Sequence, residues 1–364
     1  MPIHPSAKTR PRVLLDGLFL SDTTGIGTVW RSIFKQLAGR SLNFDLFVLS
    51  YYKSVPKIPE IIYVEVPFPG LLGFKPDQLE LLCVRLNIDL FISTYYSYPA
   101  TTPSLIVIYD CIPDVFNYDR DKNTQWKQRA EAIERASSFL TISNHTTLDL
   151  LRYYPSVKRK FITSSRLGTN FQLIASERPE IRHVNTDDPF FVFTTSYKNI
   201  ETFFEALHVL LVRTKYKLQV VFTNVDDTFL ESVRSNHPQV VVDGRRFTDE
   251  ELKWLYIHCA ALIYPSVYEG FGLPLLDAIS CGSRVICGNN SSLPEATIGR
   301  AIVVEPLDAG NLAEAISIAL EQRIDQTAFP PSHLPLHHTV GWQKFADDFL
   351  YAISLALDLA MVRI

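Results

Sequence analysis

The chain has 364 residues, of which 47% are hydrophobic and 12% aromatic, and its formal net charge is −4. This length favours two domains over one, and the composition excludes a disordered chain. A weakly acidic chain has no global positive field that attracts nucleic acid, so we expect no nucleic-acid partner. The five cysteines show no CxxC spacing, which predicts reduced thiols in a reducing compartment.

No segment of the sequence predicts export or membrane insertion. The first twelve residues lack the apolar core of a signal peptide, and the apolar segment 349–357 is too short to span a bilayer. We therefore expect a cytoplasmic protein. The basic run Lys158-Arg159-Lys160 is either a solvated turn or a contact with an anionic membrane, which would place the protein peripherally at the inner face.

The first half of the chain alternates short apolar runs with segments of helical period. This alternation is typical of a parallel sheet covered by helices. The predicted strands are 12–16, 44–49, 90–93, 105–109 and 139–142. The predicted helices are 28–38, 124–136 and 146–152.

A polar segment with weak apolar periodicity, 175–188, predicts an interdomain connection, after which the alternation restarts. The predicted strands are 190–193, 218–223, 240–242, 262–264, 284–287 and 301–304. The predicted helices are 200–212, 248–258, 275–280, 309–320 and 342–357. We thus expect an α/β protein with Rossmann-like domains at 1–174 and 175–341, the first completed by a C-terminal helix within 342–364. Ligands of such sheets bind beyond the carboxyl ends of the strands, which predicts a site in the cleft between the domains.

Residues 268–277, Y-E-G-F-G-L-P-L-L-D, follow an apolar run with the length of a buried strand. Glu269 and Asp277 are eight residues apart, so one precedes the predicted helix and the other lies about two turns along it. The N–H groups and positive dipole end of a helix start suit an anion. A strand, a glycine turn, a helix start and two separated acids predict a sugar-nucleotide site. The alternative is that Glu269 is a cap-region charge and Asp277 a solvated helix residue.

This stretch resembles the nucleotide-sugar motif of glycosyltransferase family 4, a group of retaining transferases with two facing Rossmann-like domains, the GT-B architecture. The family pattern P-S-x-x-E-G-F-G-L-P-x-L-E-A corresponds to P-S-V-Y-E-G-F-G-L-P-L-L-D-A in this chain. Three flanking segments are also similar to the family: 279–286, 289–295, and Gly244 with 247–252. Order and spacing agree over roughly residues 190–320.

The resemblance implies roles for individual side chains of the second domain. Glu269 would bind the donor sugar, and Asp277, one methylene shorter than the usual Glu, would hold the ribose. The resemblance implies that the remaining contacts with the donor come from Lys198, Gly270, Phe271, Gly272, Leu273 and Phe247. Lys198 would neutralise the diphosphate as a point charge, although Tyr197 stands where the family carries arginine. The alternative is that Lys198 is an exposed lysine without a ligand.

In the first domain, the loop with Gly25 and Gly27 resembles the family's G-I-G loop near the phosphates; the alternative is tight packing. The segment 107–113 resembles I-H-D-x-I-P, with Asp110 kept and Tyr109 in place of histidine, and tyrosine is a poor proton shuttle near neutral pH. Asn144 matches a small polar position of the family or belongs to a strand-end turn. The acceptor would be set by the loops 51–72 and 95–102, whose tyrosines either stack a sugar or pack.

The resemblance implies a hexosyltransferase of the mannosyl- or glucosyltransferase type, acting with retention. Glu269, Asp110 and Tyr109 would be its catalytic residues. The donor would be a UDP- or GDP-linked sugar and the acceptor a hydroxyl of a saccharide or glycolipid, in polysaccharide or glycoconjugate assembly. A lysine and a helix dipole can neutralise a diphosphate, so we expect no metal and no cofactor. The alternative is a non-catalytic GT-B partner that binds a nucleotide sugar, favoured by Tyr109, Tyr197 and Asp277. The oligomeric state is left unassigned.

Overall fold

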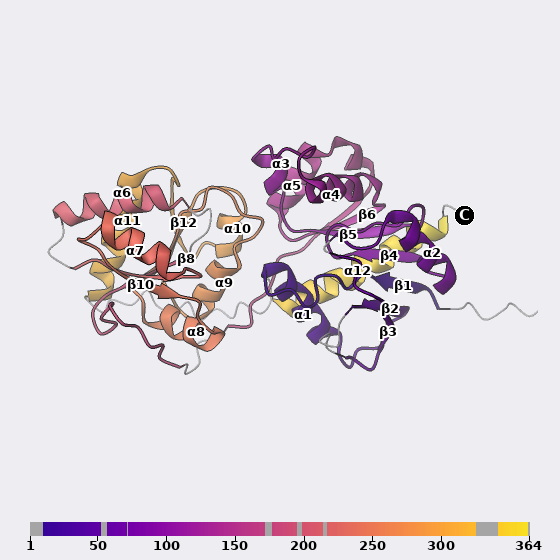
Figure 1. The fold of residues 1–364 in the computed structure, drawn as a ribbon, viewed down its shortest axis with the longest axis horizontal. Coiled ribbons are helices and arrows are strands. Elements are labelled where there is room, and N and C mark those ends of the chain that lie inside the picture. Colours follow the sequence, from indigo (N-terminus) through magenta and orange to yellow (C-terminus); the bar gives the residue numbers. More distant parts are fainter. Residues whose placement is uncertain are drawn as a thin grey trace, which may run out of the picture. The chain divides into compact units, whose positions relative to one another are not determined.

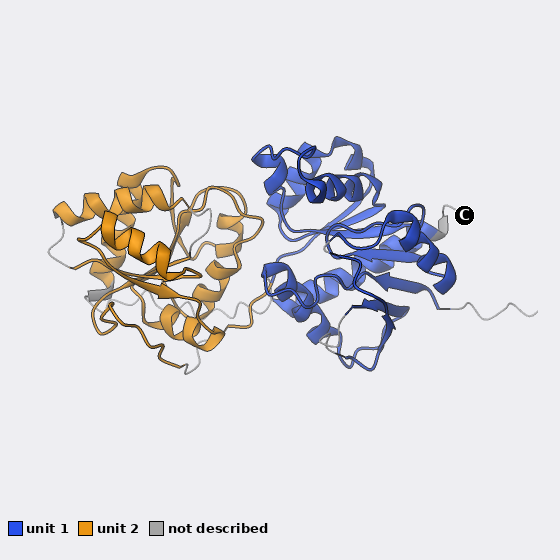
Figure 2. Ribbon diagram, in the orientation of Figure 1, with its two compact units in different colours: residues 1–167, 340–364 blue, residues 168–339 orange. Residues whose placement is uncertain are grey.

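The computed structural model describes residues 10–51, 57–70, 72–171, 177–194, 199–213, 217–324 and 341–362. The chain divides into two compact units, the first formed by 1–167 and 340–364 and the second by 168–339 (Figure 1, Figure 2). Each unit is built on one parallel β-sheet with helices. The predicted fold class, α/β with two Rossmann-like domains, is therefore confirmed.

The first unit holds a seven-stranded sheet in the order β3-β2-β1-β4-β5-β6-β7, and all neighbouring strands run parallel. The strands are β1 (Arg12–Leu15), β2 (Asp45–Ser50), β3 (Ile61–Glu65), β4 (Leu90–Ser93), β5 (Ser104–Ile108), β6 (Ser138–Thr141) and β7 (Phe161–Ser164). Every residue of the central strands β4, β5 and β6 is buried, as expected for strands that are covered on both faces.

Helices from both ends of the chain complete the first unit. They are α1 (Gly25–Leu37), α2 (Pro76–Leu86), α3 (Ile112–Val115), α4 (Thr124–Arg135), α5 (Asn144–Tyr153), the 3₁₀ turn η1 (Pro155–Arg159) and α12 (Trp342–Val362). The C-terminal helix α12 packs on α1 and on strands β4 to β7 (Figure 1). Its buried Phe349 makes an edge-to-face ring contact with Trp30 of α1, the ring centroids 5.6 Å apart.

The second unit holds a six-stranded parallel sheet in the order β10-β9-β8-β11-β12-β13. The strands are β8 (Phe191–Thr194), β9 (Gln219–Thr223), β10 (Val241–Arg245), β11 (Ala261–Tyr264), β12 (Val285–Gly288) and β13 (Ile302–Val304). The helices are α6 (Ile200–Arg213), α7 (Asp227–Asn236), α8 (Asp249–His258), α9 (Leu273–Ser280), α10 (Leu293–Thr297) and α11 (Ala309–Ile324). A group of phenylalanines in ring contact, including Phe193, Phe203 and Phe222, lies in one core of this unit.

Each sheet has one point where the strand order reverses. In the first unit this point lies between β1 and β4, and in the second between β8 and β11. A crevice opens at the carboxyl ends of the two strands at such a point, and ligands of doubly wound sheets bind there. We therefore expect functional side chains in the segments that follow β1, β4, β8 and β11.

Every predicted strand and helix is present in the structure, which adds further elements, among them β3, α2 and α7. Strand β3 lies inside 51–72, which we expected to be a loop; it is an edge strand whose Ile61 is buried while Ile62 is 47% exposed, so it lacks a continuous apolar run. Helix α2 buries only Leu79 and Cys83, so its apolar periodicity is weak. Helix α7 likewise buries two side chains. Among the described residues, no helix has the length and hydropathy needed to cross a membrane.

The segment predicted as the interdomain connection is attached to the second unit over its described part. The backbone N–H groups of Arg182 and His183 both donate to Asp243 Oδ2 at 2.7 Å. Gln219 also exchanges hydrogen bonds with the backbone of Asn185. The division between the units falls earlier, between residues 167 and 168.

Candidate functional site

Glu269 lies in the loop between β11 and α9, at the reversal point of the second sheet. Its side chain is buried, and the hydroxyls of Tyr264 and Ser266 both lie 3.0 Å from the same carboxylate oxygen, Oε1. Tyr264 is the last residue of β11, so the strand itself supplies one of the donors. Glu269 is therefore an oriented, buried carboxylate at the carboxyl edge of the sheet, just before α9.

The backbone of Glu269 is held by a second segment that the sequence singled out, 289–295. The Glu269 N–H donates to Ser291 Oγ at 3.0 Å, and Ser292 Oγ donates to the Glu269 carbonyl at 2.8 Å. Asn290 Nδ2 donates to the carbonyl of Val267. Segments 268–277 and 289–295 both resemble family motifs, and the structure connects them: segment 289–295 holds the backbone on which Glu269 is placed.

The turn between Glu269 and α9 depends on Gly272. Its φ of 97° is left-handed, and it occupies the N-cap position of α9. A Cβ atom there would lie 3.1 Å from Leu293 Cδ2 and 3.2 Å from Leu275 Cδ1. Pro274 stands in the first turn of the helix, which contains no acidic residue. The predicted residues Gly270, Phe271 and Leu273 thus border a helix N-terminus that suits an anion.

Asp277 lies on α9 and is partly buried. The Thr169 hydroxyl donates to its Oδ1, and among the described residues this is the sole hydrogen bond of the Asp277 side chain. Burial raises the pKa of Asp277 to about 7, the Thr169 hydrogen bond opposes this shift, and the charge of Asp249 adds to it. Asp277 therefore combines partial exposure with unused acceptor capacity.

The other predicted donor-binding side chains have different outcomes. Phe247 is partly buried, with the Arg245 guanidinium 4.4 Å from its ring centroid. Arg245 pairs with Glu251 through contacts of 2.6 and 3.1 Å, and Glu251 closes a capping box with Thr248. Lys198 and Tyr197 lie outside the described residues.

The predicted glycine loop of the first unit opens α1. Gly25 is its exposed first residue, whereas Gly27 is buried. A Cβ atom on Gly27 would lie 1.9 Å from the carbonyl oxygen of Asp22, so no other residue fits without a backbone shift. Gly27 therefore has the packing role that was the alternative interpretation, and this leaves the predicted phosphate role of the loop as a prediction.

Tyr109 and Asp110 follow β5 at the carboxyl edge of the first sheet. The Tyr109 hydroxyl, in a side chain that is 5% exposed, donates to the Thr94 carbonyl at 3.1 Å. Asp110 is partly buried and accepts the Ile112 N–H at 2.9 Å. Burial raises the pKa of both side chains, and the nearby Arg129 opposes this rise at Asp110. Asn144 is the exposed first residue of α5, next to the N-cap residue Ser143.

Beneath Asp110 lies a buried ion pair that the sequence did not reveal. Arg129 on α4 is 2% exposed and contacts Asp114 Oδ2 at 3.1 Å. Its guanidinium also donates to the Asp110 carbonyl and lies 5.7 Å from the ring centroid of Tyr95. The sequence signal was weak, because one arginine in a polar helix predicts a solvated charge.

A second missed residue, Asp16, follows β1 at the reversal point of the first sheet. Its carboxylate is 1% exposed and takes four hydrogen bonds, from the N–H of Leu18 and Thr94 and the hydroxyls of Thr94 and Ser97. These bonds join the segments after β1 and β4. An acid directly behind a buried strand was the available signal.

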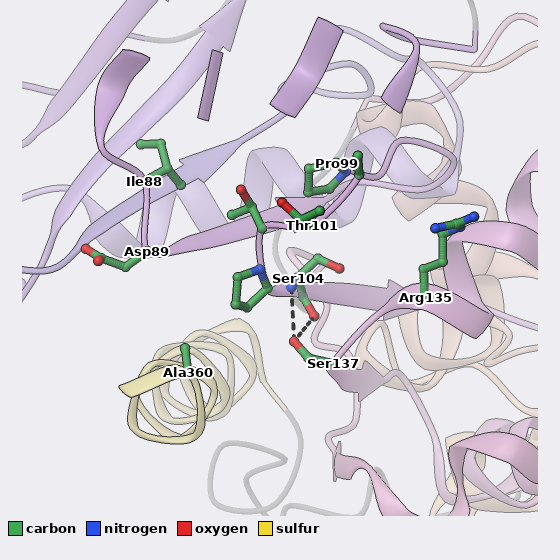
Figure 3. Close-up of a pocket in the computed structure, with 11 residues that line it drawn as sticks. Ile88, Asp89, Pro99, Thr101, Ser104, Arg135, Ser137 and Ala360 are labelled. Carbon is green, nitrogen blue, oxygen red and sulfur yellow. Dashed lines mark hydrogen bonds between the residues drawn. The ribbon is translucent and has the colours of Figure 1, made fainter. Parts of the chain in front are cut away.

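A pocket of about 430 Å³ lies at the other edge of the first sheet (Figure 3). Its walls include Asp89 before β4, Ser104 at the start of β5, and Ser137 before β6, so it borders the amino ends of these strands. The Ser104 N–H donates to Ser137 Oγ at 3.0 Å, and Ser137 Oγ donates to the Ser104 carbonyl at 2.8 Å. The pocket contains none of the predicted catalytic or donor-binding residues, although residues 99–102 of the predicted acceptor loop line it. We assign it no role in the chemistry.

The comparisons with known proteins agree with this geometry. The family model described as glycosyl transferases group 1 matches residues 189–322, which contain Glu269 and Asp277. O-antigen chain mannosyltransferase B of Escherichia coli is 26% identical over 234 residues, which cover 59% of this chain and 59% of that relative's length.

Two solved structures show the fold over almost the whole chain. Sucrose-phosphate synthase from Thermosynechococcus elongatus has a TM-score of 0.61 and 17% identity, covering 98% of each chain. HepE of Anabaena, solved in complex with UDP and glucose, has a TM-score of 0.59 and 14% identity, covering 97% of this chain and 99% of that one. The chain thus has the GT-B fold, and its second unit is similar to the group 1 glycosyl transferases. This agrees with a resemblance to glycosyltransferases, and membership of family 4 stays a prediction.

Proposed function

We propose that this protein transfers a hexose from a nucleoside diphosphate sugar to an acceptor hydroxyl, with retention at the anomeric carbon. The observation that carries the proposal is the buried, doubly hydrogen-bonded Glu269 beside the start of α9, inside the segment that matches the family model. The UDP and glucose bound to HepE support a nucleotide sugar as the donor. The E. coli relative named as a mannosyltransferase supports a hexose in polysaccharide assembly.

Glu269 and Asp277 have complementary tasks in this proposal. A carboxylate can accept two hydroxyl groups at once, so Glu269 fixes the donor sugar and Asp277 the ribose. The N–H groups at the start of α9, Lys198 and the loop with Gly25 and Gly27 take the charge of the diphosphate. No metal is required in this scheme, because the charge that develops on the leaving group is met by protein donors.

Retention defines how the proton and electrons move. The acceptor oxygen forms a bond to the anomeric carbon on the face from which the phosphate oxygen departs. The bond between that carbon and the phosphate oxygen breaks, and the nucleoside diphosphate leaves with the electron pair. The acceptor hydroxyl proton passes to the departing phosphate oxygen, its nearest base on that face. The protein's part is positioning and charge stabilisation.

In the first unit we assign Asp110 to a polar contact with the substrates and Tyr109 to positioning. Asp110 is partly exposed and its carboxylate takes one hydrogen bond among the described residues, so the carboxylate has acceptor capacity left. Tyr109 donates its proton to a backbone carbonyl and has a raised pKa, so it does not move protons near neutral pH. The five cysteines are buried thiols, which supports a reducing, cytoplasmic location.

The buried Tyr109 is also the observation that favours the second candidate, a partner protein that binds a nucleotide sugar without turning it over. Both candidates require donor binding at Glu269 and Asp277. They differ in nucleotide release, which needs the substrate contacts of the first unit as well.

The test is a donor panel. The full chain is incubated with UDP- and GDP-hexoses and oligosaccharide acceptors, nucleotide release is followed, and the product's anomeric configuration is read by NMR. We expect release with at least one donor, a retained configuration and no loss of rate in EDTA. Nucleotide binding without release under every pairing would replace the enzyme by the partner protein, and a chelator-sensitive rate would reject the metal-free scheme.

A further inference from the structure

Six aromatic side chains of the first unit form a continuous series of ring contacts. We call this series the aromatic row; it consists of Tyr109, Tyr95, Tyr96, Trp126, Tyr118 and Phe116. Successive ring centroids lie 5.7, 4.2, 6.3, 6.1 and 6.4 Å apart. The row begins beside Asp110 and passes to the α3–α4 connection, which lies at the top of the first unit in Figure 1.

The exposure of the rings increases along the row. Tyr95 and Tyr96 are 6% and 7% exposed, so these tyrosines pack, one of the two roles left open for them in the sequence. Trp126 is partly exposed, and Tyr118 and Phe116 are 42% and 41% exposed. The row thus leads from a candidate polar contact of the site to two rings that are partly exposed at the surface.

The row stands on a fixed backbone. Gln128 donates to the carbonyls of Leu72 at 2.8 Å and Tyr96 at 3.3 Å. The side chain of Asn123 caps α4 by accepting the N–H of Gln125 and of Trp126. Rings held this way lose little freedom when a ligand stacks on them, which is the condition for a preorganised binding surface.

Charges around the exposed rings cancel. Residues 119–122 read D-R-D-K, Lys122 contacts Asp119 at 3.1 Å, and Arg120 pairs with the buried Asp114. An anionic lipid surface would be drawn by an excess of basic side chains, and this segment has none. A neutral ligand with apolar faces and hydroxyl edges fits better, because its faces pack on rings and its edges meet the flanking polar groups.

We propose that the exposed end of the aromatic row binds the saccharide chain of the acceptor, with Trp126, Tyr118 and Phe116 each facing about one sugar ring. This inference rests on the proposed transfer reaction and names its acceptor as a neutral oligosaccharide rather than a single sugar. The chain's reacting end points along the row toward Asp110. Free and lipid-linked saccharides share this chemistry.

The test uses the full chain and compares Phe116→Ala/Tyr118→Ala with Tyr351→Ala. Tyr351 is 57% exposed on α12 of the same unit and makes a matched control for the loss of an exposed ring. Tyr118→Phe is the conservative variant, since it keeps the ring. Mannotetraose, maltotetraose and their monosaccharides are the probes, and their binding to donor-free protein is measured by ligand-observed NMR and calorimetry.

We expect a tetrasaccharide to bind the wild type and the Tyr351→Ala and Tyr118→Phe variants alike, and to bind Phe116→Ala/Tyr118→Ala about tenfold more weakly. UDP or GDP binding and the melting temperature should not change. Equal tetrasaccharide affinity in the double variant, or no binding of any probe to the wild type, overturns the inference while donor turnover still stands. Loss of binding to phosphatidylcholine vesicles in the double variant, with saccharide affinity unchanged, would make the row a lipid surface and also overturn it. Saccharide binding is measured without donor. Even if the protein never releases nucleotide, this measurement can therefore still confirm that the aromatic row binds a saccharide.

Discussion

Each unit has an acidic residue near the carboxyl ends of its central strands, and the two carboxylates differ in how many hydrogen bonds they accept. Asp16, behind β1 of the first unit, takes four hydrogen bonds, two on each oxygen, and is 1% exposed. Asp277, on α9 of the second unit, takes one hydrogen bond within the described part of the chain and is partly exposed. Burial raises the pKa of both carboxyl groups.

An acidic residue near the carboxyl end of a strand is therefore not by itself a functional residue. A carboxylate offers about four acceptor positions. When the fold fills all four, the group joins segments of the chain; when it fills one, the group can still bind a ligand. We therefore assign Asp16 a structural role and propose a binding role for Asp277, although a pKa shift alone would rank them together.

The largest effect is expected at Asp16. The Asp16→Ala variant leaves the N–H of Thr94 and the hydroxyl of Ser97 buried without their acceptor. We expect the free energy of unfolding to fall by about 3 kcal/mol, as measured by urea denaturation. Asp16→Asn keeps one acceptor oxygen and should lose about half as much. A loss below about 1 kcal/mol in the alanine variant would contradict the structural role.

Glu269→Gln comes next and should affect turnover rather than folding. The amide keeps the volume and one acceptor oxygen but loses the charge that strengthens hydrogen bonds to the donor sugar. We expect the turnover number in the nucleotide-release assay to fall about thirtyfold, equivalent to about 2 kcal/mol. The urea midpoint should stay close to that of the wild type. Full turnover in this variant would remove Glu269 from the site.

Gly272→Ala tests the turn before α9. Its φ of 97° strains any other residue, and the new Cβ would meet Leu293. Gly299 provides a control in the same unit, because its φ of 72° is also left-handed but nothing lies within 4 Å of a Cβ there. We expect a loss of roughly 2 kcal/mol at Gly272 and roughly 1 kcal/mol at Gly299 by thermal denaturation. Equal losses of stability in the two variants would show that the close packing around Gly272 does not contribute to the cost of the substitution.

The smallest effect is the pH dependence at Asp277. Its folded pKa of about 7 lies above the usual 3.8, so the folded protein keeps a proton that the unfolded chain releases. Stability from this group is therefore present at low pH and is lost as the pH rises from about 4 to about 7. Asp277→Asn removes the titration, and its stability relative to the wild type should rise by roughly 1 kcal/mol over that range, reduced by partial solvent exposure. Parallel stability curves for the two proteins would show that Asp277 is not desolvated.

Much of the fold could be predicted because central parallel strands are continuous apolar runs. Residues 90–93 and 262–264 needed no tertiary information, since burial on both faces makes every position apolar. Edge strand β3 and helices α2 and α7 were missed because they bury one narrow face. Their patterns are too weak for a single sequence to distinguish from loops.

The candidate site could be predicted where its residues lie close together in the sequence. Glu269, Gly272 and Asp277 share one strand–turn–helix segment, so their spacing already fixed their relation. Arg129 and Asp16 were missed because their partners are distant in sequence: Asp16 meets Thr94 and Ser97 only once β1 and β4 pair. The exposed rings of the aromatic row were missed for the same reason, since Tyr96 and Trp126 come together only in the folded unit.

Isothermal titration calorimetry measures whether the second unit binds the nucleotide of the donor through Asp277, as we propose. UDP and GDP are titrated at pH 8, where the Asp277 carboxyl is ionised, into the wild type, Asp277→Asn and the control Asp249→Asn. We predict that one nucleotide binds the wild type and the control alike and binds Asp277→Asn about tenfold more weakly. Equal affinity in all three proteins, or no binding of either nucleotide to the wild type, would contradict it.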